Sequence, residues 1–342
     1  MARVIMADDG IPFDGRRAAA APLGGAETAV AALAEALAAR GHRVTALSRG
    51  AAPVIHRGVA WLPLADGAPQ SCDLYIANRG AVLLGLVRRA GRRVLWLHNP
   101  AHYLKKPRNF WWLLRHRPLL VVSGAYHAGT VPGCLPVGGK MIIPYGLLEP
   151  FRAAAARLPP PPIAIFTSNP LRGLDWLLDL WSTRIFPAVP EAELHVYAGP
   201  AVYAGGGDKA DLMRAALARA EALQAQGVRR FAPVPHGELA AVLAGARLML
   251  YRGDPGETFC LALAEAQAMG VPAVVEPVGC VAERVSDRRT GIVAADDEAF
   301  AAAAIALLRD ARLWHSFHTA ALAMQRGLAW DEVAASFEAL IG

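Results

Sequence analysis

The chain has 342 residues, of which 54% are hydrophobic and 19% are charged. This composition excludes a disordered chain, and the length favours two folding units over a single core. The formal net charge of +6 indicates acidic partners, whether nucleoside diphosphates, anionic lipid or nucleic acid, without choosing among them.

The first half of the chain has the pattern of alternating strands and helices. A short apolar run at 3–7 leads into a loop that ends in Gly24-Gly25, and apolar residues then recur at helical spacing until Gly41. A strand at 42–47 completes a βαβ unit, which builds a parallel sheet. Further strands are predicted at 59–64, 73–77, 93–98, 119–123 and 141–144, with a helix near 80–89.

Four consecutive prolines, Pro159–Pro162, mark the predicted boundary between two domains, because such a tract is a stiff, extended spacer. The alternation then begins again. Strands are predicted at 163–167, 193–198, 229–234, 247–251, 272–276 and 290–294. The helices predicted with them are at 171–183, 208–226, 237–245, 258–269, 297–309 and 311–326. In such two-domain proteins, ligands bind beyond the carboxyl ends of the strands, in the cleft.

The stretch Tyr251–Pro272 carries the strongest functional signal. It is a Gly-, Pro- and Asp-rich loop followed by an apolar helix that ends at Gly270, with Glu257 in the loop and Glu265 inside the helix. A buried helix tolerates a carboxylate among Leu and Ala only when that carboxylate has hydrogen-bond partners. Two of them near a helix N-terminus predict a pocket for a polyol that carries a phosphate.

Two features of the first half are candidates for ligand contact. Gly24-Gly25 stands where a strand's loop turns into a helix, which suits a phosphate or sugar and equally suits a tight turn with no ligand. The spacing is not the G-x-G-x-x-G of a dinucleotide-binding protein. His98 follows a predicted strand and faces either the crevice or the turn that it would cap.

The loop after the first strand of the second half repeats this layout. Ser168 and Asn169 are candidate helix caps, and Arg172 is a candidate phosphate clamp. A plain N-cap with a solvated arginine is the alternative. His236, which opens a later helix, is interpreted as a cap.

The segment 104–118 interleaves basic residues with Phe110, Trp111, Trp112, Leu113 and Leu114. Exposed aromatics with a basic rim are typical of a peripheral contact with an anionic membrane, and they also suit single-stranded nucleic acid. The alternative interpretation is a helix whose aromatic side chains pack on the first domain.

The location of the protein is predicted from its cysteines and its apolar runs. The four cysteines are far apart and form no CxxC pair, which favours a reducing compartment over a disulfide framework or a zinc site. The sequence begins without a signal-peptide pattern and has no run near the roughly 20 apolar residues that span a bilayer. We therefore expect a cytoplasmic protein, with the segment 104–118 as a candidate peripheral contact at the inner face of the membrane.

Taken together, these motifs resemble those of the GT-B-fold retaining glycosyltransferases of the GT4-like, or glycosyltransferase group 1, family. The matching stretches are Gly24-Gly25-Ala26-Glu27, Ile143-Pro144-Tyr145-Gly146, Val196-Tyr197-Ala198-Gly199, Glu257-TFCLALA-Glu265, Thr290-Gly291 and a final helix after Trp330. The resemblance implies an α/β protein of GT-B architecture, with two Rossmann-like doubly wound domains that face each other across a cleft. It implies an acceptor domain at 1–158, a donor domain at 159–328, and a C-terminal helix at 329–342 that returns to the first domain.

The resemblance also implies roles for individual residues. Glu257 would contact the hydroxyls of the donor sugar near the reacting bond, and Glu265 the ribose hydroxyls of the nucleotide. His98 would bond the donor sugar, and Arg172 would stand for the family's lysine at the diphosphate. The other binding positions implied are Gly24, Gly25, Ser168, Asn169, Gly199, Thr258, Phe259 and Cys260. The family's first basic residue in the loop after residue 167 is replaced here by Ser168 or Asn169.

The expected activity is transfer of a sugar from a nucleoside-diphosphate-sugar to an acceptor, a lipid-linked or cell-surface glycan, with retention of configuration. We expect no metal or other cofactor and no nucleic-acid partner. A nucleotide-sugar epimerase on the same fold and a catalytically degenerate scaffold that binds a partner remain as alternatives.

Overall fold

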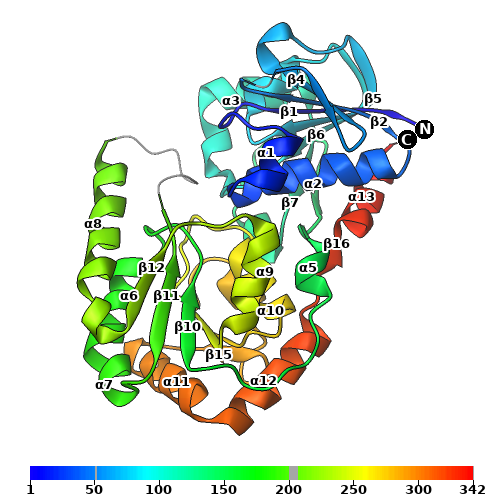
Figure 1. The fold of residues 1–342 in the computed structure, drawn as a ribbon. Coiled ribbons are helices and arrows are strands. Elements are labelled where there is room, and N and C mark those ends of the chain that lie inside the picture. The colour runs from blue at the N-terminus through cyan, green and yellow to red at the C-terminus, as the bar shows by residue number, and fades with distance from the viewer. Residues whose placement is uncertain (51, 200–206, 342) are drawn as a thin grey trace. The chain divides into compact units, whose positions relative to one another are not determined.

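The computed structural model describes residues 1–50, 52–199 and 207–341. The chain divides into two compact units (Figure 1). Unit 1 comprises Met1–Gly146 and Leu328–Gly342, and unit 2 comprises Leu147–Gly327. The chain passes from one to the other at two short strands, β9 (Gly146–Leu147) and β16 (Leu328–Ala329).

Unit 1 is built on an eight-stranded sheet of order β3-β4-β2-β1-β5-β6-β7-β8. Its strands are β1 (Arg3–Asp8), β2 (Arg43–Ser48), β3 (Val54–His56), β4 (Val59–Pro63), β5 (Ser71–Asn78), β6 (Arg89–Trp96), β7 (Leu119–Val122) and β8 (Gly139–Ile142). The edge strand β3 pairs antiparallel with β4, and the remaining pairings are parallel. The central strands are apolar and buried, as expected for a parallel sheet covered on both faces.

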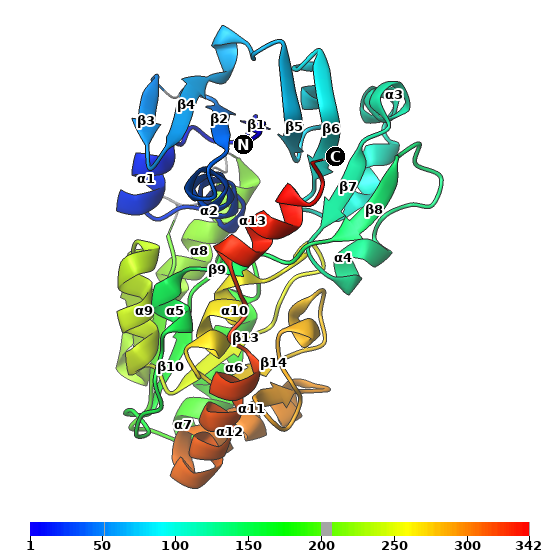
Figure 2. The same ribbon diagram turned by 90° about the vertical axis from the view of Figure 1, so that its right-hand side faces the viewer.

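Helices cover this sheet, and loops connect them to the carboxyl ends of the strands. They are α1 (Gly15–Ala20), α2 (Gly25–Ala39), α3 (Pro107–His116), α4 (Ala125–Gly129) and α13 (Trp330–Glu338), with 3-10 turns η1 (Leu64–Asp66), η2 (Ala81–Gly85) and η3 (Ala101–Lys105). The final helix α13 packs on α2, as Figure 2 shows. Arg40, just past α2, binds Asp331 at 2.9 Å and also Glu338, which holds the last residues of the chain in unit 1.

The helix predicted near 80–89 is wrong. Only the short turn η2 forms there, because β6 already begins at Arg89, where it pairs with Ser71 of the long strand β5. Leu84 and Val87 are fully buried in the core instead of forming one face of a helix. Gly85 lies against the ring of Trp112, so that a Cβ atom there would come within 2.4 Å of it.

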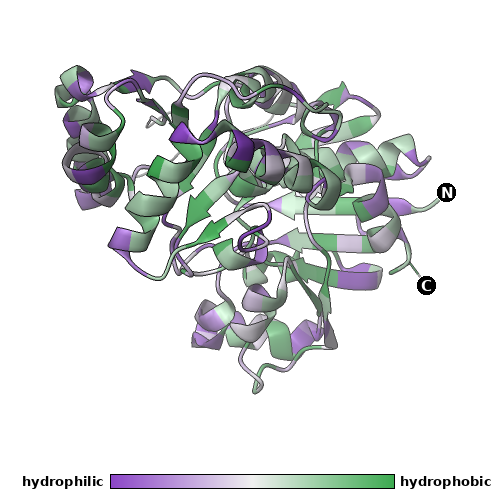
Figure 3. Ribbon diagram, turned by 90° about the horizontal axis from the view of Figure 1, so that it is seen from below, coloured by the Kyte–Doolittle hydropathy of each residue, from purple (hydrophilic) through white to green (hydrophobic). Residues whose placement is uncertain are grey.

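Unit 2 is built on a six-stranded, all-parallel sheet of order β12-β11-β10-β13-β14-β15. Its strands are β10 (Ile163–Phe166), β11 (Glu193–Tyr197), β12 (Val228–Phe231), β13 (Leu248–Tyr251), β14 (Ala273–Val275) and β15 (Gly291–Val293). Each lies within three residues of a predicted strand, because short apolar runs between turn signals identify buried parallel strands well. Figure 3 shows the hydrophobic colour along the strands of both sheets.

The helices of unit 2 flank the sheet on both faces (Figure 1). They are α5 (Glu149–Arg152), α6 (Leu174–Leu180), α7 (Phe186–Ala188), α8 (Asp208–Ala222), α9 (His236–Gly245), α10 (Leu261–Ala268), α11 (Asp297–Arg309) and α12 (Ala311–Met324). A π-helical turn, η4 (Trp181–Ile185), follows α6, and 3-10 turns form at η6 (Gln224–Gln226) and η7 (Val281–Glu283).

The boundary between the units differs from the predicted one at residue 159. Residues 147–158 belong to unit 2, because Phe151 is fully buried against the ring of His236 and Arg157 donates to the Met269 carbonyl at 2.8 Å. The proline tract is also held on this unit, since Arg247 donates to the Pro160 carbonyl at 3.2 Å. The tract is therefore the entry to β10 and not a free spacer.

Candidate active site

Two neighbouring parallel strands of unit 2, β10 and β13, end at the same edge of the sheet and carry the first group of polar side chains. Ser168 lies just past β10, Tyr251 is the last residue of β13, and Glu257 lies in the loop that follows. The Ser168 and Tyr251 hydroxyls are hydrogen-bonded at 3.1 Å. Tyr251 in turn donates to Glu257 Oε2 at 2.7 Å.

Glu257 is the centre of this cluster. It is only 3% exposed, and its second oxygen, Oε1, accepts from Arg172 Nη1 at 2.8 Å. Burial raises the pKa of Glu257, while the Arg172 charge and the hydrogen bonds from Tyr251 and Cys260 oppose that rise. The structure therefore brings together Glu257, Arg172 and Ser168, and it places Arg172 on the carboxylate itself.

The expectation that Ser168 and Asn169 cap the following helix is wrong. The N-cap of α6 is Gly173, whose φ of 86° needs a residue without a Cβ atom. Ser168 instead binds Tyr251, and Asn169 Oδ1 accepts from the Leu171 amide at 2.9 Å in a tight turn. Both side chains thus shape the loop that holds Arg172.

Thr258, Phe259 and Cys260 form the buried turn between Glu257 and α10. Cys260 has a left-handed backbone, with φ of 59°, and it is the N-cap of α10. The helix therefore begins at Leu261, three residues later than predicted. The Arg284 guanidinium lies 4.6 Å from the centre of the Phe259 ring and covers this turn.

Glu265 lies inside α10 and is 3% exposed. Its Oε1 atom is 3.2 Å from Nε2 of His236, the first residue of α9. Burial disfavours a charged imidazole, but the Glu265 carboxylate outweighs this effect and raises the pKa of His236. The interpretation of His236 as a cap is wrong, since α9 has no side-chain cap and this ring is the partner of Glu265.

Gly199 lies at the carboxyl end of β11, and a Cβ atom there would come within 2.9 Å of the Pro233 ring. Only a glycine lets the loops after β11 and β12 approach so closely. The residues that follow, 200–206, lie outside the described part of the chain.

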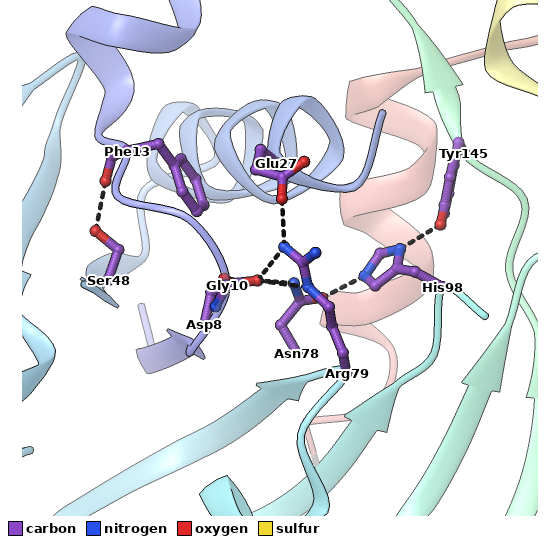
Figure 4. A network of polar contacts seen from close by, with 9 residues as sticks. All are labelled: Asp8, Gly10, Phe13, Glu27, Ser48, Asn78, Arg79, His98 and Tyr145. Atoms are coloured by element: carbon purple, nitrogen blue, oxygen red, sulfur yellow. Dashed lines mark hydrogen bonds and ion pairs between the residues drawn. The ribbon is translucent and has the colours of Figure 1, made fainter. Parts of the chain in front are cut away.

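A second group of polar side chains lies at the carboxyl edge of unit 1 (Figure 4). Asp8 ends β1, Asn78 ends β5, and His98 stands two residues beyond β6. The Asn78 amide donates to Asp8, and Asn78 Oδ1 is hydrogen-bonded to His98 Nε2. The other ring nitrogen of His98 is hydrogen-bonded to the hydroxyl of Tyr145.

His98 is thus held on both sides by the protein. It is 8% exposed, and the Trp96 ring lies 4.7 Å away, centre to centre. Burial lowers the pKa of His98 well below its usual value, and the nearby Arg79 and His127 lower it further. The ring is therefore neutral at physiological pH.

Gly24 and Gly25 form the N-terminus of α2, with Gly24 as its N-cap. The carboxylate of Glu27 lies over this turn, because a Cβ atom on Gly24 would come within 2.5 Å of Glu27 Oε2. Arg79 holds that carboxylate at 2.7 Å and also holds Asp8 at 2.8 Å. A ligand phosphate at this N-terminus would therefore meet an existing ion-pair network.

Comparison with known proteins shows which family this part of the chain resembles. Residues 161–310, which make up most of unit 2, match the family model "Glycosyl transferases group 1". This stretch is similar to the group 1 glycosyl transferases. No curated protein matches the sequence.

The fold of the chain is shared with solved structures of low sequence identity. Sucrose-phosphate synthase (tll1590) from Thermosynechococcus elongatus is similar with a TM-score of 0.73 and 16% identity over 99% of this chain and 98% of that one. Anabaena Alr3699/HepE in complex with UDP-glucose gives 0.72 and 15%, with 99% of both chains covered. WaaG, a glycosyltransferase of lipopolysaccharide biosynthesis, gives 0.70 and 14%, again with 99% of both covered. The prediction of a GT-B-fold glycosyltransferase is confirmed.

Several residues of these polar clusters were not predicted as site residues, namely Asp8, Asn78, Arg79, Tyr145, His236 and Tyr251. The rule that identified His98, a polar residue just past a strand, applies equally to Asp8 and Asn78. His236 gives no such signal, because its partner Glu265 lies 29 positions later in the sequence.

The basic and aromatic segment 104–118 forms α3 and its flanks. Leu113 is fully buried, and Phe110 and Trp112 pack against the core of unit 1. Trp111 and Leu114 are 61% and 51% exposed. The structure therefore divides the aromatic residues between the core and the surface.

Two further features concern metals and membranes. Within residues 1–50, 52–199 and 207–341, no group of three or more His, Cys, Asp or Glu side chains is arranged to hold a metal ion. None of the helices in this described part has the length and apolar character needed to cross a bilayer.

Proposed function

We propose that this group 1 glycosyltransferase moves a sugar from a nucleoside-diphosphate-sugar to a hydroxyl of an acceptor, with retention at the anomeric carbon. The observation that carries the proposal is the cluster of Arg172, Tyr251 and Glu257 at the carboxyl edge of unit 2. A buried carboxylate that two donors hold in place is suited to accept hydrogen bonds from sugar hydroxyls in one fixed orientation.

The nucleotide would bind beside this cluster. Glu265 would accept the ribose hydroxyls, since its carboxylate is buried one turn into α10 and oriented by His236. The amides of Thr258, Phe259 and Cys260, at the N-terminus of α10, together with Ser168, Asn169 and Gly199, would line the sugar and diphosphate. We propose Gly24 and Gly25 as further contacts of the diphosphate, and His98 as a contact of the sugar.

The chemistry needs charge stabilisation more than a strong base. The bond between the anomeric carbon and the phosphate oxygen breaks, and a bond to the acceptor oxygen forms on the same face. The acceptor's proton passes to the departing phosphate oxygen, so that no carboxylate needs to act as a dedicated base. Arg172 and the helix N-terminus would stabilise the negative charge on that phosphate. We propose that the reaction needs no metal or other cofactor.

The first test is transfer from UDP-glucose, which is present in the complex of Anabaena HepE, by the variants Glu257→Gln and Arg172→Ala. We expect kcat to fall by about 100-fold or more in each, the usual cost of removing one preorganised contact to developing charge. Arg229→Gln is the matched control, because it breaks an exposed 3.2 Å ion pair between Arg229 on β12 and Glu193 on β11. Activity near that of the parent protein in both site variants would contradict the proposal.

Binding of the nucleotide is tested separately. Glu265→Ala should weaken binding of the nucleoside diphosphate by about ten- to a hundredfold, the range for a lost hydrogen bond to a charged group. A thermal-shift series with UDP-, GDP- and ADP-sugars identifies the base. A response to none of them would favour the degenerate scaffold, and a changed sugar without any acceptor would favour the epimerase.

We also propose that α3 makes a peripheral contact with an anionic membrane that presents a lipid-linked acceptor, at the cytoplasmic face. Arg108, Trp111, Leu114 and Arg115 follow one another at helical spacing, and all four are exposed. Lys105 and Lys106 precede them. A tryptophan at the interface with cations at the lipid headgroups is the arrangement that such a contact requires.

Flotation with liposomes of anionic and neutral lipid tests the membrane contact. The double variant Trp111→Ala with Leu114→Ala should lose binding to anionic vesicles, while Ile55→Ala should keep it. Ile55 is the matched control because it is 79% exposed on β3 of the same unit. Equal flotation of the parent protein and both variants would exclude α3 as the contact.

A further inference from the structure

The hydrogen-bond network in unit 1 determines more than the position of His98. Asp8 is 1% exposed, and its carboxylate accepts from the Gly10 amide at 2.7 Å and from Arg79 Nη2 at 2.8 Å. It also accepts from the side-chain amide of Asn78. Because a carboxylate oxygen surrounded by donors only accepts, the NH2 group of Asn78 must face Asp8.

That orientation leaves Asn78 Oδ1 facing the histidine. Figure 4 shows the chain of contacts from Asp8 through Asn78 to His98 and Tyr145. A carbonyl oxygen has no hydrogen to donate, so Nε2 of His98 must carry the proton of that hydrogen bond. In a neutral ring the Nδ1 atom is then unprotonated, and it accepts from the Tyr145 hydroxyl.

We propose that Asn78, aligned by Asp8 and Arg79, is a positioning residue that fixes His98 as the Nε2–H tautomer and makes its Nδ1 atom a hydrogen-bond acceptor. The imidazole is buried beside the Arg79 guanidinium, which disfavours a second proton on the ring.

The consequence concerns which groups His98 recognises, and it rests on the proposed function in that His98 contacts the donor sugar. A substrate group that replaced the Tyr145 hydroxyl at Nδ1 would have to donate a hydrogen bond. A sugar hydroxyl does so, whereas an ionised phosphate or carboxylate oxygen does not. The network therefore selects a hydroxyl at this position and rejects an anion.

Long-range proton–nitrogen correlation spectra of histidine-labelled protein read the tautomer directly. The sequence has 10 histidines, and the signals missing from His98→Gln assign this ring. We expect a protonated Nε2 and an unprotonated Nδ1 in the parent protein. A protonated Nδ1 with an unprotonated Nε2 would overturn the proposal without any further variant.

Three variants separate the partners of the ring. In Asn78→Leu the signals should move toward a mixture of tautomers, whereas Tyr145→Phe should keep the Nε2–H form. Tyr103→Phe is the control, because it removes a 2.6 Å bond to the Arg79 carbonyl and leaves the network intact. An unchanged tautomer in folded Asn78→Leu, or a lost one in Tyr145→Phe, would overturn the proposal. If Asn78→Leu fails to fold, the His98 tautomer measured in the parent protein and in Tyr145→Phe still tests the proposal.

Transfer kinetics complete the test. Asn78→Leu should lower kcat by about 10- to 100-fold, the scale for partners that orient a histidine ligand, with little change in nucleotide affinity. Parent-like kcat together with the tautomer change would overturn the positioning role. A protein that transfers no sugar at all contradicts the proposed function but leaves the spectra readable, so the two failures are distinguishable.

Discussion

At the scale of single residues, the polar groups of both units contain buried carboxylates that the protein itself pairs with basic side chains. Glu257 has Arg172, Glu265 has His236, and Asp8 has Arg79. Taking a carboxylate out of water costs several kcal/mol unless a partner compensates. The pairs therefore keep the carboxylates fixed before any substrate arrives, and a hydroxyl that binds to one of them adds to an existing network.

The pair of Glu265 and His236 makes the stability of unit 2 depend on pH. The pKa of His236 is raised above its usual 6.5, so the protonated ring stabilises the folded state. This stabilisation is fully present below pH 6.5, and it is lost as the pH rises through the raised pKa. His236→Gln should remove about 1.5–3 kcal/mol at acid pH, the range for a hydrogen bond to a charged group, and little above the raised pKa.

Urea unfolding of both proteins well below and well above pH 6.5, followed by hydrogen exchange in α9 and α10, measures this difference. His195→Gln is the control, since His195 pairs with Glu193 at 2.7 Å at a more exposed position. Its curve should follow that of the parent protein. A difference in unfolding free energy between the parent protein and His236→Gln that stays constant with pH would contradict the role of the charge.

Individual partners were the hardest part to predict from the sequence. The positions of Glu257, Glu265 and His98 could be predicted, because a carboxylate in an apolar helix and a polar residue past a strand are local signals. That Arg172 binds Glu257, 85 positions away, depends on which strands are neighbours in the sheet. Only the strand order places β10 beside β13.

At the scale of elements, the end of α10 was better predicted than its start. The α10 helix ends at Ala268 before Gly270, where the predicted Gly and Pro stop stands. Its start at Leu261 was missed by three residues, because a left-handed cysteine gives no signal in the sequence. The exposed edge strand β3 was not predicted, since it is only three residues long.

The end of α10 gives a second prediction. Gly270 has φ of 70°, and a Cβ atom there would come within 2.5 Å of His318 Nδ1 and 2.8 Å of Leu322. Gly270→Ala should destabilise unit 2 by about 2 kcal/mol or more, because left-handed strain and overpacking add. Gly245→Ala, at the end of α9 with no atom within 4 Å, should change stability by less than about 1 kcal/mol. Thermal unfolding of the two variants measures this difference, and an equal loss of stability in both would contradict the close contact at Gly270.

At the scale of the whole molecule, the division into two α/β units could be predicted because the alternation of strands and helices begins again after residue 162. The position of the boundary could not. A run of four prolines indicates a stiff connection, but it does not reveal that Phe151 and Arg157, upstream of it, are held by unit 2. The segment 147–158 belongs to unit 2 because Phe151 is buried against residues that are distant in the sequence.

Removing that aromatic side chain tests the assignment. Phe151 is fully buried on α5, beside α9 and α10, so Phe151→Ala should cost about 3–5 kcal/mol. Hydrogen exchange should then speed up in α9 and α10 of unit 2. Phe13→Ala is the matched control in unit 1, where Phe13 is 3% exposed and packs edge-on against Trp61. It should speed up exchange in β2 and β4. Faster exchange in the strands of unit 1 and not in unit 2 after Phe151→Ala would place the boundary back at the proline tract.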